Sequence, residues 1–274
     1  MTKPNRLLRY SADRRSLATV ACGLLLLVAP LAINFSAAAL WIRFPFAALF
    51  CLISSVVNHN HMHRPIFYSH ALNVGLNALL SIGRGHSATG IVVPHNHNHH
   101  VHAGSRNDWI SPRFAGRGPG VVRIPRYIVS VSANMAFQRW KKNAPKLSRR
   151  WRLSSFLEKA VLWALVGSVF MFWGLNHVLT TFVIPWAAGL AMLVAVNLLQ
   201  HEGVNNGSRD FVGSFTNWLL FNNGYHTVHH LYPSLHWSRL PEKHRQICHQ
   251  KPHEYEEPSL LLYLARMMIT RAPE

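Results

Sequence analysis

Four long apolar stretches divide the chain into pieces of membrane-spanning length. They cover residues 17–34, 37–57, 159–176 and 181–199. Because about 20 consecutive apolar residues cross the hydrocarbon core of a bilayer, each stretch predicts one transmembrane helix. The stretches form two close pairs, so we expect an all-α integral membrane protein with four transmembrane helices in two hairpins. The first stretch has a basic front like that of a secretory signal, but its long apolar core and the second stretch close behind it predict a retained helical hairpin.

Two long polar segments, residues 58–158 and 200–274, separate and follow the hairpins. Residues 73–82 are apolar enough for a helix but too few to cross a membrane, so they predict an interfacial or re-entrant piece. Residues 124–151 mix aliphatic and aromatic residues with a basic run, which is typical of an amphipathic helix on a membrane surface, although a loop explains it nearly as well. We expect one membrane domain over residues 1–274, in which the two polar segments form a helical cap.

The distribution of charge predicts how the chain is oriented in the membrane. Charged residues make up 14% of the chain, below the usual share of about a quarter, yet the net charge is +18 at pH 7. Lys and Arg gather before the first hairpin and in the two polar segments, and the short turns inside the hairpins hold none. By the positive-inside rule we expect both termini and both polar segments in the cytoplasm, as in a multi-pass protein of a bacterial inner membrane. Orientation and attraction to anionic membrane lipid explain the basic excess better than nucleic-acid binding does.

The three cysteines exclude two kinds of site. Cys22 and Cys51 fall inside predicted spans, Cys248 lies in the last segment, and none belongs to a CxxC pair. This pattern argues against a disulfide framework and against an iron–sulfur or zinc site built from cysteines. An electron carrier, if the chemistry needs one, must come from another polypeptide.

Histidines carry the chemical signal, because 19 of them cluster near the predicted cytoplasmic ends of the spans. His59 and His63 follow the second span four residues apart, so they face the same way if the helix continues. His95 and His99 repeat this spacing, and His100 lies about 100° further around a helix. The second cluster can therefore address two metal ions at once.

A third cluster and the end of the fourth span add further candidates. His226, His229 and His230 form the third cluster, in which the first two histidines are three residues apart instead of four. This cluster can also provide ligands to two metal ions. His201 ends the fourth span, and Asn197 lies one turn before it. Polar side chains on one face of an apolar membrane helix are costly there and are functional candidates by default.

The remaining histidines have simpler explanations. His61, His97 and His102 belong to the clusters but lie on the wrong helical side, so we expect solvent contacts or supporting roles for them. Scattered histidines such as His244 are expected at the surface or the membrane interface. The three histidine clusters, which we call boxes, lie at the same predicted end of the helical bundle. Surface polarity alone does not explain this arrangement.

The donor set limits the kind of metal site. The chain has ten Asp and Glu residues and none of them falls inside a box, which excludes a carboxylate-bridged di-iron site of the ferritin kind. Eight or nine imidazoles exceed the three or four ligands of a tetrahedral zinc ion. Imidazole suits iron, copper, zinc and nickel alike, so the spacing implies two metals and leaves their identity open.

The boxes resemble a known family. HxxxH at His59, HxxxHH at His95 and HxxHH at His226 are similar to the three histidine boxes of the membrane fatty acid desaturase and hydroxylase superfamily. The run NNGYHTVHHLYP (residues 222–233), followed by Leu240-Pro241, resembles the NxxxHxxHHxxP and LP signature of that superfamily. The resemblance covers residues 57–241 and agrees with the hairpin topology.

The resemblance implies two non-haem irons, with O2 as co-substrate. The implied ligands are His59, His63, His95, His99, His100, His201, His226, His229 and His230. It also implies that Asn197 holds an iron through water. Ligating imidazoles usually donate their second N–H to a partner, and Asp108, Asp210 and Asn222 lie near the boxes as candidates for such contacts. No catalytic residue beyond the metal centre is assigned.

The resemblance also implies the reaction class. We expect an O2-dependent desaturase that introduces a double bond into an acyl chain, and the alternative is a hydroxylase or ketolase of an acyl chain or a carotenoid. A histidine-rich metal transporter is a remote alternative, because a transporter places its ligands near the bilayer midplane. The implied partners are membrane lipid, an acyl group on CoA, a carrier protein or a lipid, and an external electron donor such as ferredoxin or a cytochrome b5-like protein.

Overall fold

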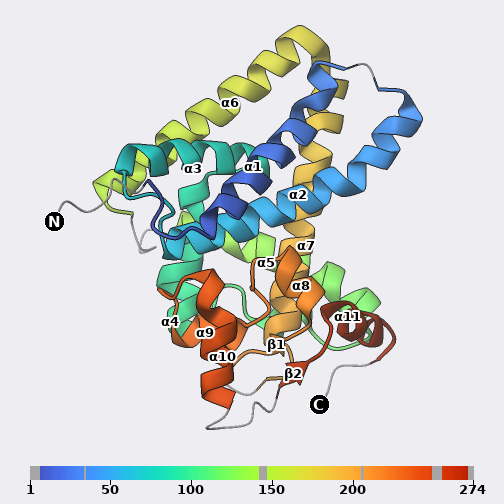
Figure 1. Cartoon of the computed structure of the whole chain (residues 1–274). Helices are drawn as coiled ribbons and strands as arrows, with labels where there is room; N and C mark the ends of the chain where they lie inside the picture. The colour runs from blue at the N-terminus through green and yellow to red at the C-terminus, as the bar shows by residue number, and fades with distance from the viewer. Residues whose placement is uncertain (1–6, 34, 142–146, 205–206, 249–254, 271–274) are drawn as a thin grey trace, which may run out of the picture. The chain divides into compact units, whose positions relative to one another are not determined.

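The described chain folds into two compact units. The computed structural model describes residues 7–33, 35–141, 147–204, 207–248 and 255–270 (Figure 1). The first unit combines the chain up to residue 91 with residues 147–192, and the second combines residues 92–146 with the chain from residue 193.

The first unit holds the long apolar helices. They are α1 (Asp13–Val28), α2 (Ala37–His63), α3 (His70–Arg84), α6 (Arg149–Val178) and the first half of α7 (Ile184–His201). The shorter elements are the 3-10 turns η1 (Ala29–Leu31) and η2 (Ala88–Ile91) and the π-helical turn η5 (Leu179–Val183). Ser36, Ser69 and Ser148 cap the starts of α2, α3 and α6, where each side chain accepts a hydrogen bond from a backbone N–H of the first turn.

Three helical runs among the described residues are long and apolar enough to cross a membrane: Asp13–Leu31, Ala37–His63 and Arg149–His201. The first two correspond to the first predicted hairpin, and α2 continues beyond residue 57 through the first histidine box. The third run joins the last two predicted spans, because α6, η5 and α7 follow one another without a loop. Gly174 nevertheless has φ 80° and ψ 178°, far from helical values, so the run bends there. The described residues therefore show three candidate spans, and the predicted count of four is not confirmed.

A short helix that the sequence predicts around residues 73–82 is present in the structure. It is α3, whose fifteen residues are too few to cross a bilayer. Large apolar side chains on the outer faces of α2 and α6, including Trp41, Phe46, Trp163 and Phe172, are exposed. An exposed apolar surface of this kind suits contact with lipid.

A buried arginine explains how one polar side chain is accommodated in α2. Arg43 donates hydrogen bonds to the carbonyls of Leu26 (3.0 Å), Leu27 (2.6 Å) and Thr180 (3.3 Å). The first two carbonyls belong to the last turn of α1, where the helix itself supplies no donor. Arg43 therefore satisfies the end of α1 and connects it to both α2 and η5.

Close packing of α1 on α2 depends on Gly23. A Cβ atom at this position would lie 1.7–2.4 Å from ring atoms of the buried Phe50. We expect Gly23→Ala to lower the free energy of unfolding by about 1–3 kcal/mol, as overpacking usually does. Thermal unfolding in detergent measures this loss.

Gly167→Ala on α6 is the matched control for that change, because nothing lies within 4 Å of the added Cβ. This substitution should stabilise the helix by about 0.5–1 kcal/mol, since alanine has the higher helix propensity. Equal effects of the two substitutions would contradict the close contact between α1 and Phe50.

The second unit consists of shorter elements around the end of α7. It contains the π-helix η3 (Val92–His99), α4 (His100–His102), η4 (Pro112–Ala115), α5 (Gly120–Trp140), β1 (Asp210–Phe211), α8 (Ser214–Leu219), α9 (His226–Leu231), η6 (Trp237–Arg239), α10 (Leu240–Cys248), β2 (Glu256–Glu257) and α11 (Leu260–Ile269). The two short strands pair in parallel, with Asp210 opposite Glu256 and Phe211 opposite Glu257. The helix predicted over residues 124–151 corresponds to α5 only as far as Trp140, because residues 149–151 already belong to α6. Residues 142–146 lie outside the described residues.

A buried core holds the second unit together. Its members include Ala115, Tyr127, Val131, Leu198, Leu199, Phe211 and Met267. A buried ion pair joins α5 to the end of α7, with Arg123 Nη1 and Glu202 Oε1 separated by 2.6 Å. Glu202 directly follows His201, so this ion pair helps to fix the position of a histidine that the sequence singles out.

Candidate metal centre

Four imidazoles converge in the second unit from three elements. His99 ends η3, His201 ends α7, and His226 and His230 lie on α9. Their ligand nitrogens all lie within 4.8 Å of one another. The Nε2 atom of His201 lies 3.1 Å from that of His99 and 2.9 Å from that of His226, and the Nε2 atoms of His226 and His230 are 3.2 Å apart. We call these four residues the His99 group.

Hydrogen bonds at the opposite ring nitrogens fix the tautomers of two members. The Nδ1 atom of His99 lies 3.0 Å from Oδ2 of the buried Asp108, and the Nδ1 atom of His201 lies 3.1 Å from the carbonyl of Gly207. Because both partners are acceptors, both Nδ1 atoms carry the proton. The two Nε2 atoms, 3.1 Å apart, then present lone pairs to each other. A cation between them removes this repulsion, so the arrangement fits a metal site.

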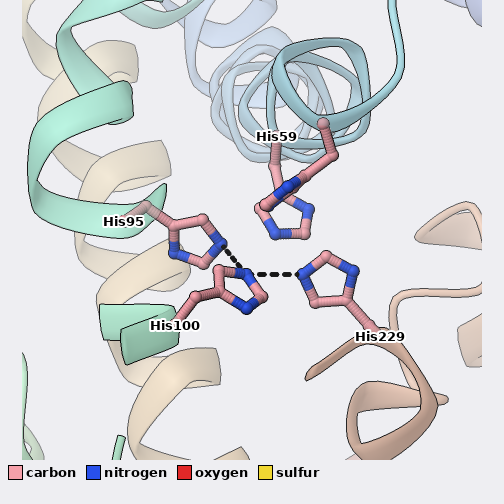
Figure 2. A group of neighbouring side chains, drawn as sticks. His59, His95, His100 and His229 are labelled. Atoms are coloured by element: carbon pink, nitrogen blue, oxygen red, sulfur yellow. Dashed lines mark hydrogen bonds between the residues drawn. The ribbon is translucent and has the colours of Figure 1, made fainter. Parts of the chain in front are cut away.

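Three more imidazoles form a second group in the same unit. Figure 2 shows His95, His100 and His229 side by side, with dashed lines from His100 to each of the others. The Nε2 atom of His100 lies 3.0 Å from that of His95 and 3.1 Å from that of His229. We call these three residues the His95 group. The second unit thus offers two adjacent sets of imidazole ligands.

Local backbone geometry decides which histidine joins which group. The second box begins in a π-helix that ends at His99, and the hydrogen bonds of a π-helix connect residues five apart. His95 therefore lies beside His100. On an ordinary α-helix, the four-residue spacing would instead place His95 in one group with His99. In the third box, α9 has α-helical geometry, so His226 and His230 share one face and His229 points to the other group.

The first box lies at the end of α2 in the first unit. The rings of His59 and His63 face each other edge-on, with centroids 5.0 Å apart, which agrees with their predicted four-residue spacing. His61 points away and its Nδ1 accepts a hydrogen bond from the backbone N–H of Ile66 at 3.2 Å. His59 and His63 stay predicted ligands.

The other predicted site residues make different contacts. Asn197 donates its amide to the hydroxyl of Tyr127 at 2.7 Å, and Tyr127 in turn donates to the carbonyl of Ile110. Asn222 donates to the carbonyl of Trp237 at 3.1 Å and has a left-handed backbone, with φ 59°. Both asparagines therefore hold nearby backbone in place, and the water-mediated role of Asn197 remains a prediction.

The two predicted acidic partners of the boxes differ in their neighbours. Asp108 contacts a box imidazole directly, as described above. Asp210 instead accepts a hydrogen bond from the backbone N–H of Thr227 (2.7 Å) and lies 3.2 Å from the ring of His244. Asp210 thus supports the third box through the backbone of Thr227.

Asp108 gives a direct test of the His99 group. We expect Asp108→Asn to weaken metal binding about 10–100-fold, because the loss of a carboxylate behind a ligating imidazole has effects of this size. A competition titration with a chelator of known iron affinity measures the change. Glu242→Gln makes the same change of charge at an exposed position on α10 and should leave the affinity unaltered, whereas equal affinities of all three proteins would contradict the role of Asp108.

Comparison with known protein families agrees with this geometry. The model of the fatty acid desaturase family matches residues 35–258, which is more than half of the chain and includes all three boxes. The chain belongs to the fatty acid desaturase family. Comparisons with curated proteins and with solved structures found no match. Family membership makes the chain an oxidoreductase of the fatty acid desaturase and hydroxylase type, and its histidine groups are suited to the metal that such chemistry needs.

Proposed function

We propose that the chain is an O2-dependent, di-iron fatty acyl desaturase that introduces a carbon–carbon double bond into an acyl chain. One observation carries the proposal: two neighbouring imidazole groups, each with Nε2 atoms about 3 Å apart, lie within a chain of the desaturase family. The His99 group offers four nitrogens to one iron. The His95 group offers three to the other, and His59 and His63 are the ligands proposed to complete it.

Two irons held by these groups would supply activation of O2 and abstraction of hydrogen from an unactivated methylene. The residues of the chain orient and retain the ions. Asp108 and the carbonyl of Gly207 keep the protons of His99 and His201 on Nδ1, so both rings would present their Nε2 lone pairs to the ion. Because three of the four imidazoles in the His99 group are buried, little water reaches them.

We propose that the chain crosses the membrane four times. The run Arg149–His201 has 53 residues, which corresponds to about 80 Å of helix at 1.5 Å per residue. A hydrocarbon core about 30 Å thick accommodates that length only if the run turns back. The non-helical Gly174 and the π-helical η5 provide such a turn, and the two polar segments are then on one side, which the positive-inside rule assigns to the cytoplasm.

Electrons are proposed to come from a separate protein. Among the described residues, Cys22, Cys51 and Cys248 are all free, and none lies in a motif for an iron–sulfur cluster. A ferredoxin or a cytochrome b5-like protein is the proposed donor, and the acyl group is proposed to arrive on CoA, a carrier protein or a lipid. The net charge of +18 favours an acidic donor protein.

The test is an analysis of acyl chains from a host that produces the protein, together with a donor system and a His230→Ala control. Gas chromatography with mass spectrometry should show a new acyl chain lighter by two hydrogens, and derivatisation then locates the double bond. A product heavier by one oxygen would replace desaturation with hydroxylation. Unchanged acyl chains together with an oxygenated carotenoid would assign the chain to the ketolase alternative.

A further inference from the structure

A third cluster of donor atoms shares no residue with the two histidine groups. His244 and Cys248 lie one turn apart on α10, and Glu256 lies on β2. The Nε2 atom of His244 lies 3.5 Å from Sγ of Cys248 and 3.2 Å from Oε1 of Glu256, and the sulfur lies 3.1 Å from the same carboxylate oxygen. One nitrogen, one sulfur and one oxygen thus meet at a single point.

The imidazole of His244 is oriented for ligation. Its other nitrogen, Nδ1, lies 3.2 Å from Oδ2 of the fully buried Asp210. A carboxylate at this place holds the ring proton on Nδ1 when a metal ion replaces the proton on Nε2, so that the Nε2 lone pair would be directed at the ion together with Cys248 and Glu256. Carboxylate, imidazole and metal form this same series in many zinc proteins. The ring of Tyr225, with its centroid 4.9 Å from that of His244, packs beside it.

We propose that His244, Cys248 and Glu256 bind a zinc-class divalent ion, with Asp210 as the residue that orients His244. Thiolate, imidazole and carboxylate are the three ligand types of protein-bound zinc. Zinc bond lengths of about 2.0–2.3 Å in a tetrahedral site place ligand atoms roughly 3.3–3.6 Å apart, close to the separations of this cluster. Three protein ligands leave a fourth position for water at this partly exposed surface.

Local charge favours a cation at this point. Asp210 and Glu256 flank His244 on its two nitrogens. A divalent ion compensates the negative charge of the two carboxylates and stabilises the thiolate.

The proposed zinc would support the third histidine box. β1 and β2 pair through Asp210 and Glu256, so the ion would join α10 to this two-stranded ladder. The other carboxylate oxygen of Asp210, Oδ1, accepts from the N–H of Thr227 in α9. The ion is thus connected through one side chain to the helix that carries His226, His229 and His230.

Cobalt(II) is the probe that distinguishes this site from the imidazole groups. Bound to a thiolate, cobalt gives an intense charge-transfer band in the near ultraviolet, which imidazole ligands alone do not give. The full-length protein in detergent, titrated with cobalt, should develop this band until one equivalent is bound at the site. Zinc added afterwards should remove it. Absence of the band from the unaltered protein would overturn the proposal without bearing on the di-iron assignment.

Two cysteine variants test whether Cys248 is the ligand that gives the charge-transfer band. Cys248→Ser should lose it, and Cys22→Ser should keep it, because Cys22 is an exposed cysteine on α1. Asp210→Asn should weaken cobalt binding at this band about 10–100-fold while the amide oxygen still accepts from Thr227. A band that persists in Cys248→Ser, or that disappears in Cys22→Ser, would refute the site.

Discussion

His230→Ala is expected to abolish product formation while membrane insertion is retained. His230 supplies one of four imidazoles in the His99 group, and its Nε2 lies 3.2 Å from that of His226. Its ring also lies beside His100 of the other group, with centroids 4.5 Å apart. Loss of this ring therefore opens one ion site and removes a neighbour of the second.

Product analysis and metal analysis together measure this effect. Gas chromatography with mass spectrometry should detect no new acyl product, and iron per purified chain should fall by about half or more relative to the unaltered protein. Since enzymatic rate enhancements are typically at least about a millionfold, loss of the metal centre leaves no measurable turnover.

His97→Ala is the matched control for His230→Ala. His97 belongs to the second box, is exposed, and is in neither imidazole group among the described residues. This variant should keep both product and iron. A normal product yield from His230→Ala, at equal protein level, would refute the di-iron assignment.

Glu158→Ala should cause the largest loss of stability. The Glu158 carboxyl group is buried where α6 meets η2. Its Oε2 accepts from the hydroxyl of Ser87 (2.6 Å) and from the backbone N–H and hydroxyl of Thr89 (3.0 and 3.1 Å), and its Oε1 accepts from the hydroxyl of Ser154 (2.8 Å). Each buried donor without an acceptor costs about 1–3 kcal/mol.

The hydroxyls can partly compensate for this loss, because Ser87 also contacts Ser155 at 3.0 Å. The backbone N–H of Thr89 has less freedom to find another acceptor. We therefore expect Glu158→Ala to lower the free energy of unfolding by about 3 kcal/mol. Thermal unfolding in detergent, or the yield of monodisperse protein, measures the change.

Two further variants define the cause. Glu158→Gln should lose less stability, because its amide oxygen still accepts from Thr89. Lys159→Ala, at the adjacent exposed position, should stay within about 0.5 kcal/mol of the unaltered protein. If Lys159→Ala were as destabilising as Glu158→Ala, the hydrogen-bond network would not be the cause.

Sequence reasoning succeeded where regular periodicity holds. Apolar length predicted the helices of the membrane region and a helix around residues 73–82, which is α3. The four-residue spacing predicted that His59 and His63 face the same way, and their rings pack edge-on. Each of these inferences needs only the geometry of an ordinary α-helix.

The pairing in the second box could not be predicted, because it depends on a departure from that geometry. A π-helix at residues 92–99 brings His95 to His100 and separates it from the group of His99. No single residue type signals a π-helix. The bend at Gly174 is similar, since a glycine inside an apolar run is compatible with a straight helix and with a turn.

The His244 cluster was missed for a different reason. His244 was expected to be a surface residue, and Cys248 was judged by the absence of a CxxC partner. The HxxxC spacing of these two residues was a usable signal, because it places them on one helix face. Their partners Asp210 and Glu256 come from strands that pair only in the folded chain, so their proximity has no signature in the sequence.

Neighbouring residues in the chain serve both imidazole groups. His99 and His100 are consecutive and divide between the groups, as His229 and His230 do. The separation between two ions held there is therefore constrained by covalent geometry at two places. A change that shifts one of these short segments moves a ligand of each ion together, so the two ions would keep their spacing.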